Sequence, residues 1–325
     1  GSSHFLEKEV CCHVRVGHGE PDTLGANQES CKVALMEMRQ KIGPSIFDKY
    51  QNKFGFGQYT DIDLPNEASC AGLLYDEDMS ELDLATNSFG QNFNLTMIQM
   101  ISAYSSLING GYYYKPYIVK GIYSDDGELI SSNSKTLVSR TISGETSDII
   151  KKCLRAVVVN GTGDYAAIDG YVISGKTGTA EKRGREDGVY LVSFIGFAPY
   201  DDPGVLCYVV IDEPEAGDEH GVSSKLFHNI MSEVLPLLNI KTADQDDDPY
   251  KVSVTGPAAN TTPDVIEEET TAGEESEGNE EGEAGGKETW WSGEEDYYEE
   301  TYYEEGYYEE GYYEDNYYYE EDYGY

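Results

Sequence analysis

Apolar residues recur at the spacing of an amphipathic helix in several stretches of the chain. Within residues 95–109 they fall three and four positions apart, and Gly110-Gly111 follows as a helix end. Ser143 is suited to cap a further helix, because its side chain can accept a hydrogen bond from the first helical turn. The pattern predicts helices over residues 27–42, 45–53, 95–109, 143–159 and 221–238.

Strand patterns follow in the second half of the body. Three strands are predicted over residues 171–177, 190–198 and 205–212, and the last two are nearly continuous apolar runs, which is typical of strands buried on both faces. Residues 112–140 predict a polar hairpin that turns at Asp125-Asp126-Gly127. Because the three strands are neighbours in the sequence, we expect antiparallel pairing. The predicted fold class is α+β, a sheet with helices packed on its faces.

Charge is distributed unevenly along the chain. The formal net charge is −40, and residues 241–325 hold 29 acidic residues and only three basic ones. Residues 297–316 consist of four five-residue repeats that each begin with two tyrosines. Such a composition buries too little apolar surface to order itself, so we expect a folded body over 1–240 and a disordered acidic tail over 241–325. The tail is interpreted as solvated, self-repelling chain, with binding of a basic partner or of cations as the alternative.

Several classes of function are disfavoured. The chain has no basic patch, so nucleic acid is not expected as a partner, and it has neither a run of about 18 apolar residues nor a signal peptide. The first residue is glycine rather than methionine, so we expect a fragment. Cys11-Cys12-His13 and His18 are of zinc-ligand type, but their spacing fits no usual zinc site, so no metal and no cofactor are expected.

Candidate chemistry centres on residues 171–180, where a β-branched run leads into Lys176-Thr177-Gly178. Lys176 would place a fixed positive charge beside a strand edge, and Thr177 offers a hydroxyl for a substrate carboxylate. Gly178 would leave room for a substrate peptide to approach the strand, and the backbone N–H of Thr179 is suited to hold an oxyanion.

The same stretch has a competing interpretation. Residues 170–177 also satisfy the pattern of a phosphate-binding loop, which must be flexible, follow a strand and begin a helix. Here the intervening residues are strand-like and no helical period follows. Nucleotide binding is therefore not expected.

Further landmarks lie in order around this stretch. They are Phe54-Gly55-Phe56-Gly57 and residues 60–68, 88–91, 161–163, 176–179 and 193–199. With them the chain resembles the class B penicillin-binding proteins, the D,D-transpeptidases of cell division and sporulation, from about Cys12 to Ile240. The resemblance implies the fold of penicillin-binding proteins and serine β-lactamases, incomplete at its N-terminus.

The resemblance also implies three catalytic motifs, in the order Ser-x-x-Lys, Ser-x-Asn and Lys-Thr-Gly. Ser30-Cys31-Lys32 matches the second motif, which makes Ser30 the proton relay and puts Lys32, as a substrate-binding residue, where the family has asparagine. A lysine cannot supply the hydrogen-bond acceptor of an amide. By the same resemblance Lys176 and the N–H of Thr179 are catalytic, and Thr177 and Gly178 bind substrate.

The nucleophile of the first motif is not expected within this chain. Ser132-Asn133-Ser134-Lys135 matches it in letters only, because it follows Ser30 and lies in the predicted hairpin, where no helix could present it. The family places the motif a few dozen residues before Ser30, which here means before Gly1. The chain is therefore expected to be the C-terminal part of a transpeptidase, inactive alone.

The function implied by the resemblance is peptidoglycan cross-linking. A serine attacks a D-Ala-D-Ala peptide, an amine of a second strand takes the acyl group, and β-lactams mimic the donor. The expected partners are peptidoglycan stem peptides, β-lactams and proteins of the division or sporulation machinery. The expected location is the extracytoplasmic face of the bacterial cell membrane, reached through a missing N-terminal anchor. The alternative is a non-catalytic peptidoglycan- or β-lactam-binding module.

Overall fold

The computed structural model describes residues 2–5, 8–14, 16–70, 72, 74–182, 188–215, 221–242 and 248. The chain divides into two units, residues 1–260 and 261–325, and every described residue belongs to the first unit. Apart from residues 241, 242 and 248, the predicted tail therefore lies outside the described residues. None of the described helices combines the length and the apolar character that a membrane crossing requires.

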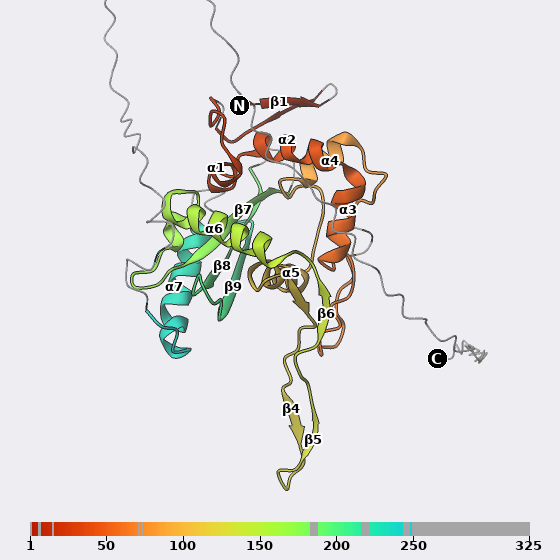
Figure 1. Ribbon diagram of the computed structural model, residues 1–325, viewed down its shortest axis with the longest axis vertical. Coiled ribbons are helices and arrows are strands. Elements are labelled where there is room, and N and C mark those ends of the chain that lie inside the picture. The colour runs from red at the N-terminus through yellow and green to blue at the C-terminus, as the bar shows by residue number, and fades with distance from the viewer. Residues whose placement is uncertain are drawn as a thin grey trace, which may run out of the picture. The chain divides into compact units, whose positions relative to one another are not determined.

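A three-stranded antiparallel sheet lies at the centre of this unit (Figure 1). Its strands are β7 (Ser174–Glu181), β8 (Tyr190–Ala198) and β9 (Val205–Asp212), in that spatial order. The predicted antiparallel pairing and the bounds of the last two strands are confirmed. The first strand begins and ends later than expected, because the pairing of β7 with β8 runs from Ser174 opposite Phe197 to Glu181 opposite Tyr190. Lys-Thr-Gly therefore lies inside a strand rather than at its end.

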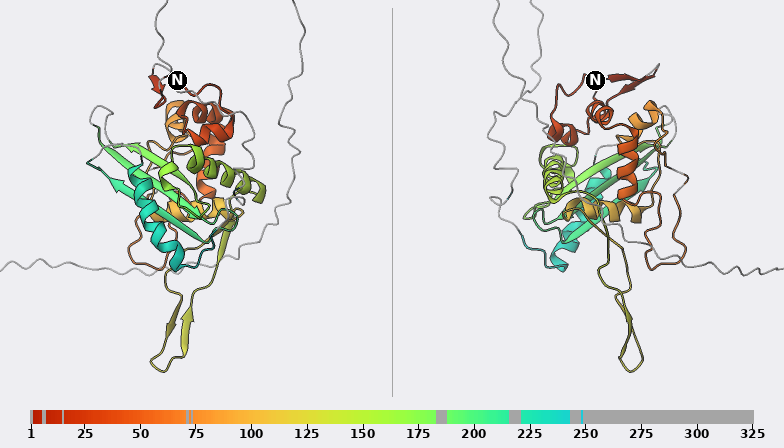
Figure 2. Two further views of the ribbon diagram at one scale, coloured as in Figure 1. Left: turned by 90° about the vertical axis from the view of Figure 1, so that its left-hand side faces the viewer. Right: turned by 45° about the vertical axis from the view of Figure 1, so that its right-hand side comes forward.

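Helices cover both faces of the sheet, as the apolar runs predicted. The α7 helix (Val222–Leu237) covers one face (Figure 2). Its Phe227 packs against Phe194 of β8, with the ring centres 4.7 Å apart. On the other face α5 (Met97–Ile108) brings Tyr104 against Ile195 of β8. Neighbouring residues of β8 thus enter two different cores. The α6 helix (Gly144–Asn160) contributes Val158 to the first core and contacts β7, which holds the strand in place.

The N-terminal part forms a cap of short elements. They are β1 (Ser2–Phe5), β2 (Lys8–Cys11), α1 (Thr23–Gln28), α2 (Lys32–Ile42), α3 (Pro44–Lys53) and α4 (Glu81–Asn87). The single helix expected over residues 27–42 is wrong, because the chain breaks between α1 and α2 at Ser30, whose φ is 48°. The α4 helix was not predicted, although Ser80 and Asp83 form a capping box at its start.

The predicted hairpin is present and has two paired levels. The pair next to the body is β3 (Tyr112–Tyr114) with β6 (Leu137–Arg140). The pair at the tip is β4 (Gly121–Tyr123) with β5 (Leu129–Ser132). Figure 1 shows β4 and β5 projecting away from the other elements. The carboxylate of Asp63 accepts hydrogen bonds from the N–H groups of Ile118 and Val119, and these bonds lower the pKa of Asp63. Asp63 thereby holds the chain just before the tip pair in place.

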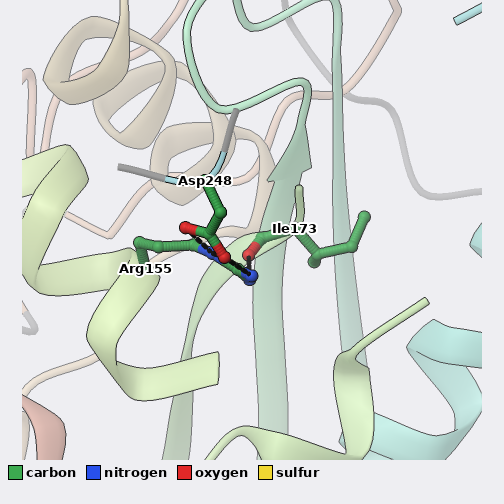
Figure 3. Close-up of polar contacts among 3 residues, drawn as sticks. All are labelled: Arg155, Ile173 and Asp248. Carbon is green, nitrogen blue, oxygen red and sulfur yellow. Dashed lines mark hydrogen bonds and ion pairs between the residues drawn. The ribbon is translucent and has the colours of Figure 1, made fainter. Parts of the chain in front are cut away.

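A buried ion pair ties a distant acidic residue to the body (Figure 3). Asp248 is 2% exposed, and its carboxylate accepts hydrogen bonds from Arg155 of α6 at 2.5 to 3.2 Å. The same guanidinium donates to the carbonyl of Ile173, just before β7. Asp248 lies beyond the boundary expected at residue 240, so contacts with the body extend at least to that residue. The short helix η2 (Asp164–Ala166) lies between α6 and β7.

Candidate functional site

The sequence-predicted site residues meet at one cleft. A cavity of about 420 Å³ lies between strand β7 and the break that separates α1 from α2. Ser30, Lys32, Lys176, Thr177, Gly178 and Thr179 all line it. The two motifs, far apart in the sequence, are therefore brought together as expected.

The position of Ser30 follows from how α1 ends. The N–H of Cys31 donates to the carbonyl of Ala26 at 2.9 Å, and the N–H of Ser30 donates to that of Asn27 at 3.2 Å. This pair of bonds is the Schellman helix end, in which the residue with positive φ is usually glycine. Here that residue is Ser30, and its hydroxyl contacts the ammonium of Lys176. The left-handed turn thus aims a hydroxyl at the lysine.

Lys176 has an unusual electrostatic environment. The residue as a whole is half-buried, but its ammonium is surrounded by protein atoms, and this burial lowers its pKa to about 8. The ammonium also donates to the carbonyl of Thr177 at 3.1 Å. A lysine with this pKa can carry a positive charge for a carboxylate at neutral pH and can also release a proton near it.

The Gly161–Gly163 turn positions the hydroxyl of Thr177. Thr162 forms a hydrogen bond with Thr177 between the two hydroxyls at 2.8 Å. The turn itself is pressed against α1, because a Cβ added at Gly161 would lie 2.5 Å from the carbonyl oxygen of Gln28. Thr162 was recognised in the sequence as part of a family landmark but not as a site residue. The sequence could have indicated Thr162, because it carries the one polar side chain between two glycines.

Gly178 also lies close to a side chain of the neighbouring strand. A Cβ at Gly178 would lie 2.6 Å from the hydroxyl oxygen of Ser193 on the neighbouring strand β8. A side chain at residue 178 would therefore require the Ser193 hydroxyl to turn away. Thr179, the next residue, is exposed and pairs with Val192 in the β7–β8 register.

Lys32 begins α2 and faces an aromatic ring across the cleft. Its ammonium lies 5.2 Å from the ring centre of Phe89, a residue of the landmark at 88–91. Phe89 lines the cavity as well, and it also borders a second cavity of about 690 Å³ that shares Gly178 and Thr179. Phe89 is a cleft residue that the sequence interpretation did not single out.

Two rejected alternatives stay rejected on structural grounds. Ser132 is exposed at the end of strand β5, in the projecting hairpin (Figure 1). The Ser-x-x-Lys sequence at 132–135 is therefore not presented by a helix, and it does not line the cleft. Residues 174–177 of the phosphate-loop match lie in β7, and this strand continues to Glu181 instead of beginning a helix. A phosphate-binding loop is therefore absent from this stretch.

Comparison with known proteins places this geometry in a family. The family model described as the penicillin binding protein transpeptidase domain matches residues 13–232. Stage V sporulation protein D of Bacillus subtilis is 40% identical over 239 residues, which cover 71% of this chain and 36% of that protein. Penicillin-binding protein PbpB of Mycolicibacterium smegmatis is 32% identical over 249 residues, which cover 72% of this chain and 38% of that protein. The chain thus spans less than two fifths of the length of these curated relatives.

A solved structure agrees with the sequence relatives. The crystal structure of penicillin binding protein 3 from Mycobacterium tuberculosis in complex with ampicillin superposes with a TM-score of 0.70 at 28% sequence identity. The superposition covers 77% of this chain and 58% of that one.

Proposed function

The chain belongs to the transpeptidase domain family of class B penicillin-binding proteins, and we propose that its cleft recognises D-Ala-D-Ala peptides and the β-lactams that mimic them. The observation that carries the proposal is the contact between the Ser30 hydroxyl and the Lys176 ammonium, beside the Thr177 hydroxyl. A hydroxyl, a cation of lowered pKa and a second hydroxyl at one strand edge suit the binding of a carboxylate next to a reacting carbonyl.

Each residue receives a role in this proposal. Lys176 and Thr177 bind the terminal carboxylate, and the N–H of Thr179 holds the oxyanion. Ser30 relays a proton through its contact with Lys176. Among the described strands β7 pairs only with β8, so its other edge is open to the main chain of a substrate peptide.

We propose that the nucleophile lies on a Ser-x-x-Lys helix outside residues 1–325. The one match in letters, residues 132–135, lies on the exposed hairpin. We propose that this chain supplies the relay and carboxylate-binding groups of a peptidoglycan-cross-linking enzyme at the extracytoplasmic face of the membrane, working with division or sporulation proteins. Lys32, which stands where the family has asparagine, places a cation over Phe89 instead of an amide.

The test measures acylation by a fluorescent penicillin in a protein that joins a Ser-x-x-Lys segment to this chain. Lys176→Ala is expected to lower the acylation rate constant about 10- to 150-fold, because a hydrogen bond to a charged group contributes about 1.5–3 kcal/mol. Lys182→Ala is the matched control. Its ammonium lies 2.8 Å from Asp212 and 2.8 Å from Glu213, so its loss should leave the rate unchanged.

Two results would contradict the proposal. Equal effects of the two substitutions would show that Lys176 does not bind the carboxylate. A penicillin adduct on the 325-residue chain alone, located by mass spectrometry on a serine of residues 1–240, would assign the nucleophile to a different residue and remove the role proposed for Ser30.

A further inference from the structure

A thiol and two imidazoles meet beside the cleft, in the segment between β2 and α1. The Sγ of Cys12 lies 3.6 Å from Nδ1 of His13 and 3.7 Å from Nδ1 of His18. The three ligand atoms all lie within 4.8 Å of one another. Cys12 is 1% exposed, so its thiol faces the protein interior rather than water.

Hydrogen bonds within this cluster are weak. The thiol of Cys12 faces both imidazoles, and a thiol is a weak donor and a weak acceptor. The other ring nitrogen of His18, Nε2, is buried without a hydrogen-bond partner. The imidazole of His18 is therefore held by Cys12 and by the ring of His13, whose centre lies 5.1 Å away.

The distances match those of a metal site. In tetrahedral zinc coordination, with Zn–S of about 2.3 Å and Zn–N of about 2.0–2.1 Å, sulfur and nitrogen ligands lie about 3.6 Å apart. Both observed S···N separations agree with this value. We propose that Cys12, His13 and His18 bind a zinc ion.

Thiolate and imidazole are the ligands that zinc prefers, and three protein ligands leave the fourth position of a tetrahedron to a water molecule. The spacing along the sequence gave no indication of such a site, because the three ligands come from one irregular loop. The fold, rather than a spacing rule, brings the three side chains together.

The proposed ion would lie beside the cleft. His13 lines the same cavity as Ser30 and Lys176. A metal bound by Cys12, His13 and His18 would therefore hold one side of this cavity in place. The binding site itself stands independently of whether the cleft acylates.

Cobalt substitution of the purified 325-residue chain, kept reduced, tests the proposal. Cobalt bound by thiolate shows a near-ultraviolet charge-transfer band, whereas cobalt bound by carboxylates of the acidic tail does not. We expect this band at one cobalt per chain, its loss when one equivalent of zinc is added, and its loss in Cys12→Ser. Cys153→Ser is the matched control, because Cys153 is a buried free thiol in α6, outside the cluster.

A second variant removes the concern that a buried substitution unfolds the protein. His13 is exposed, so His13→Ala should fold normally and weaken cobalt binding at least tenfold. A reduced wild-type chain without the charge-transfer band would overturn the proposal. A band that survives both Cys12→Ser and His13→Ala would overturn it as well.

Discussion

At the scale of single residues, Lys176 shows what sequence and structure each contribute. The letters Lys-Thr-Gly are enough to identify the residue and its chemistry. The partner of its ammonium could not be predicted from them, because Ser30 lies 146 positions away. The lowered pKa depends on how densely the fold surrounds the ammonium, and composition carries no information about that.

This lowered pKa predicts a pH dependence of stability. Lys176 titrates at about 8 in the folded chain and at 10.5 when it is unperturbed, so between these values the unfolded state binds more protons. The free energy of unfolding should therefore rise with pH from 8 to 10.5, relative to a chain that lacks the group. Lys176→Met should remove this rise, as measured by urea unfolding across the interval.

The control for this measurement is Lys182→Met. Its carboxylate partners, Asp212 and Glu213, raise the pKa of Lys182 above 10.5, so its titration falls outside the interval. Parallel stability curves for the wild type and Lys176→Met would mean that the ammonium is not desolvated in the folded chain.

At the scale of elements, the sequence predicted the sheet better than the helix that carries Ser30. Strands β8 and β9 were predicted with their observed bounds, because each strand coincides with a long apolar run whose two ends are marked by polar residues or proline. The start of β7 was placed too early, since the β-branched residues before Ser174 resemble a strand more than the Lys-Thr-Gly core does. Pairing with β8 decides the register, and this is a non-local effect.

The break between α1 and α2 escaped prediction for a related reason. Helix ends are usually signalled by glycine, and here the left-handed position is occupied by a serine, Ser30, with φ of 48°. A serine in this conformation costs about 1 kcal/mol. The fold tolerates that cost where the hydroxyl contacts Lys176.

Two substitutions of Ser30 should distinguish the effect of its backbone conformation from the effect of its hydroxyl. Ser30→Gly relieves the left-handed strain and Ser30→Ala does not, so the glycine variant should be more stable by about 1 kcal/mol in urea unfolding. Both variants lack the hydroxyl and should lose penicillin acylation equally, when measured with a Ser-x-x-Lys segment present. The same pair at Ser232, within helix α7, should show the opposite order, because glycine destabilises a helix interior.

If alanine were the more stable variant at both positions, the left-handed turn at Ser30 would be contradicted. Unequal acylation by the two Ser30 variants would mean that the backbone of this turn, and not the hydroxyl alone, contributes to the reaction.

At the scale of the whole molecule, the long-range connections were the least predictable part. The nearly continuous apolar run of β8 correctly predicted a sheet covered on two faces. Composition indicated an acidic tail from residue 241, but a run of carboxylates does not reveal which of them will be buried. Asp248 pairs with Arg155 across 93 positions of sequence, and that contact depends on where α6 places its guanidinium.

The ion pair between Arg155 and Asp248 predicts where the chain can be shortened. A chain that ends at residue 250 keeps Asp248 and should unfold at the same urea concentration as the full chain. A chain that ends at residue 242 leaves the guanidinium of Arg155 buried without this partner and should lose about 3 kcal/mol of unfolding free energy. Asp248→Ala in the full chain should reproduce that loss.

The cause of the loss can be separated from the effect of removing chain length. Replacing both partners with apolar residues, as Arg155→Met with Asp248→Leu, should recover most of the stability, since neither charge then remains buried and unpaired. Asp148→Ala removes an exposed pair with Lys151 and should cost less than about 1 kcal/mol. If the chain that ends at 242 were as stable as the one that ends at 250, the Arg155–Asp248 pair would not stabilise the folded body.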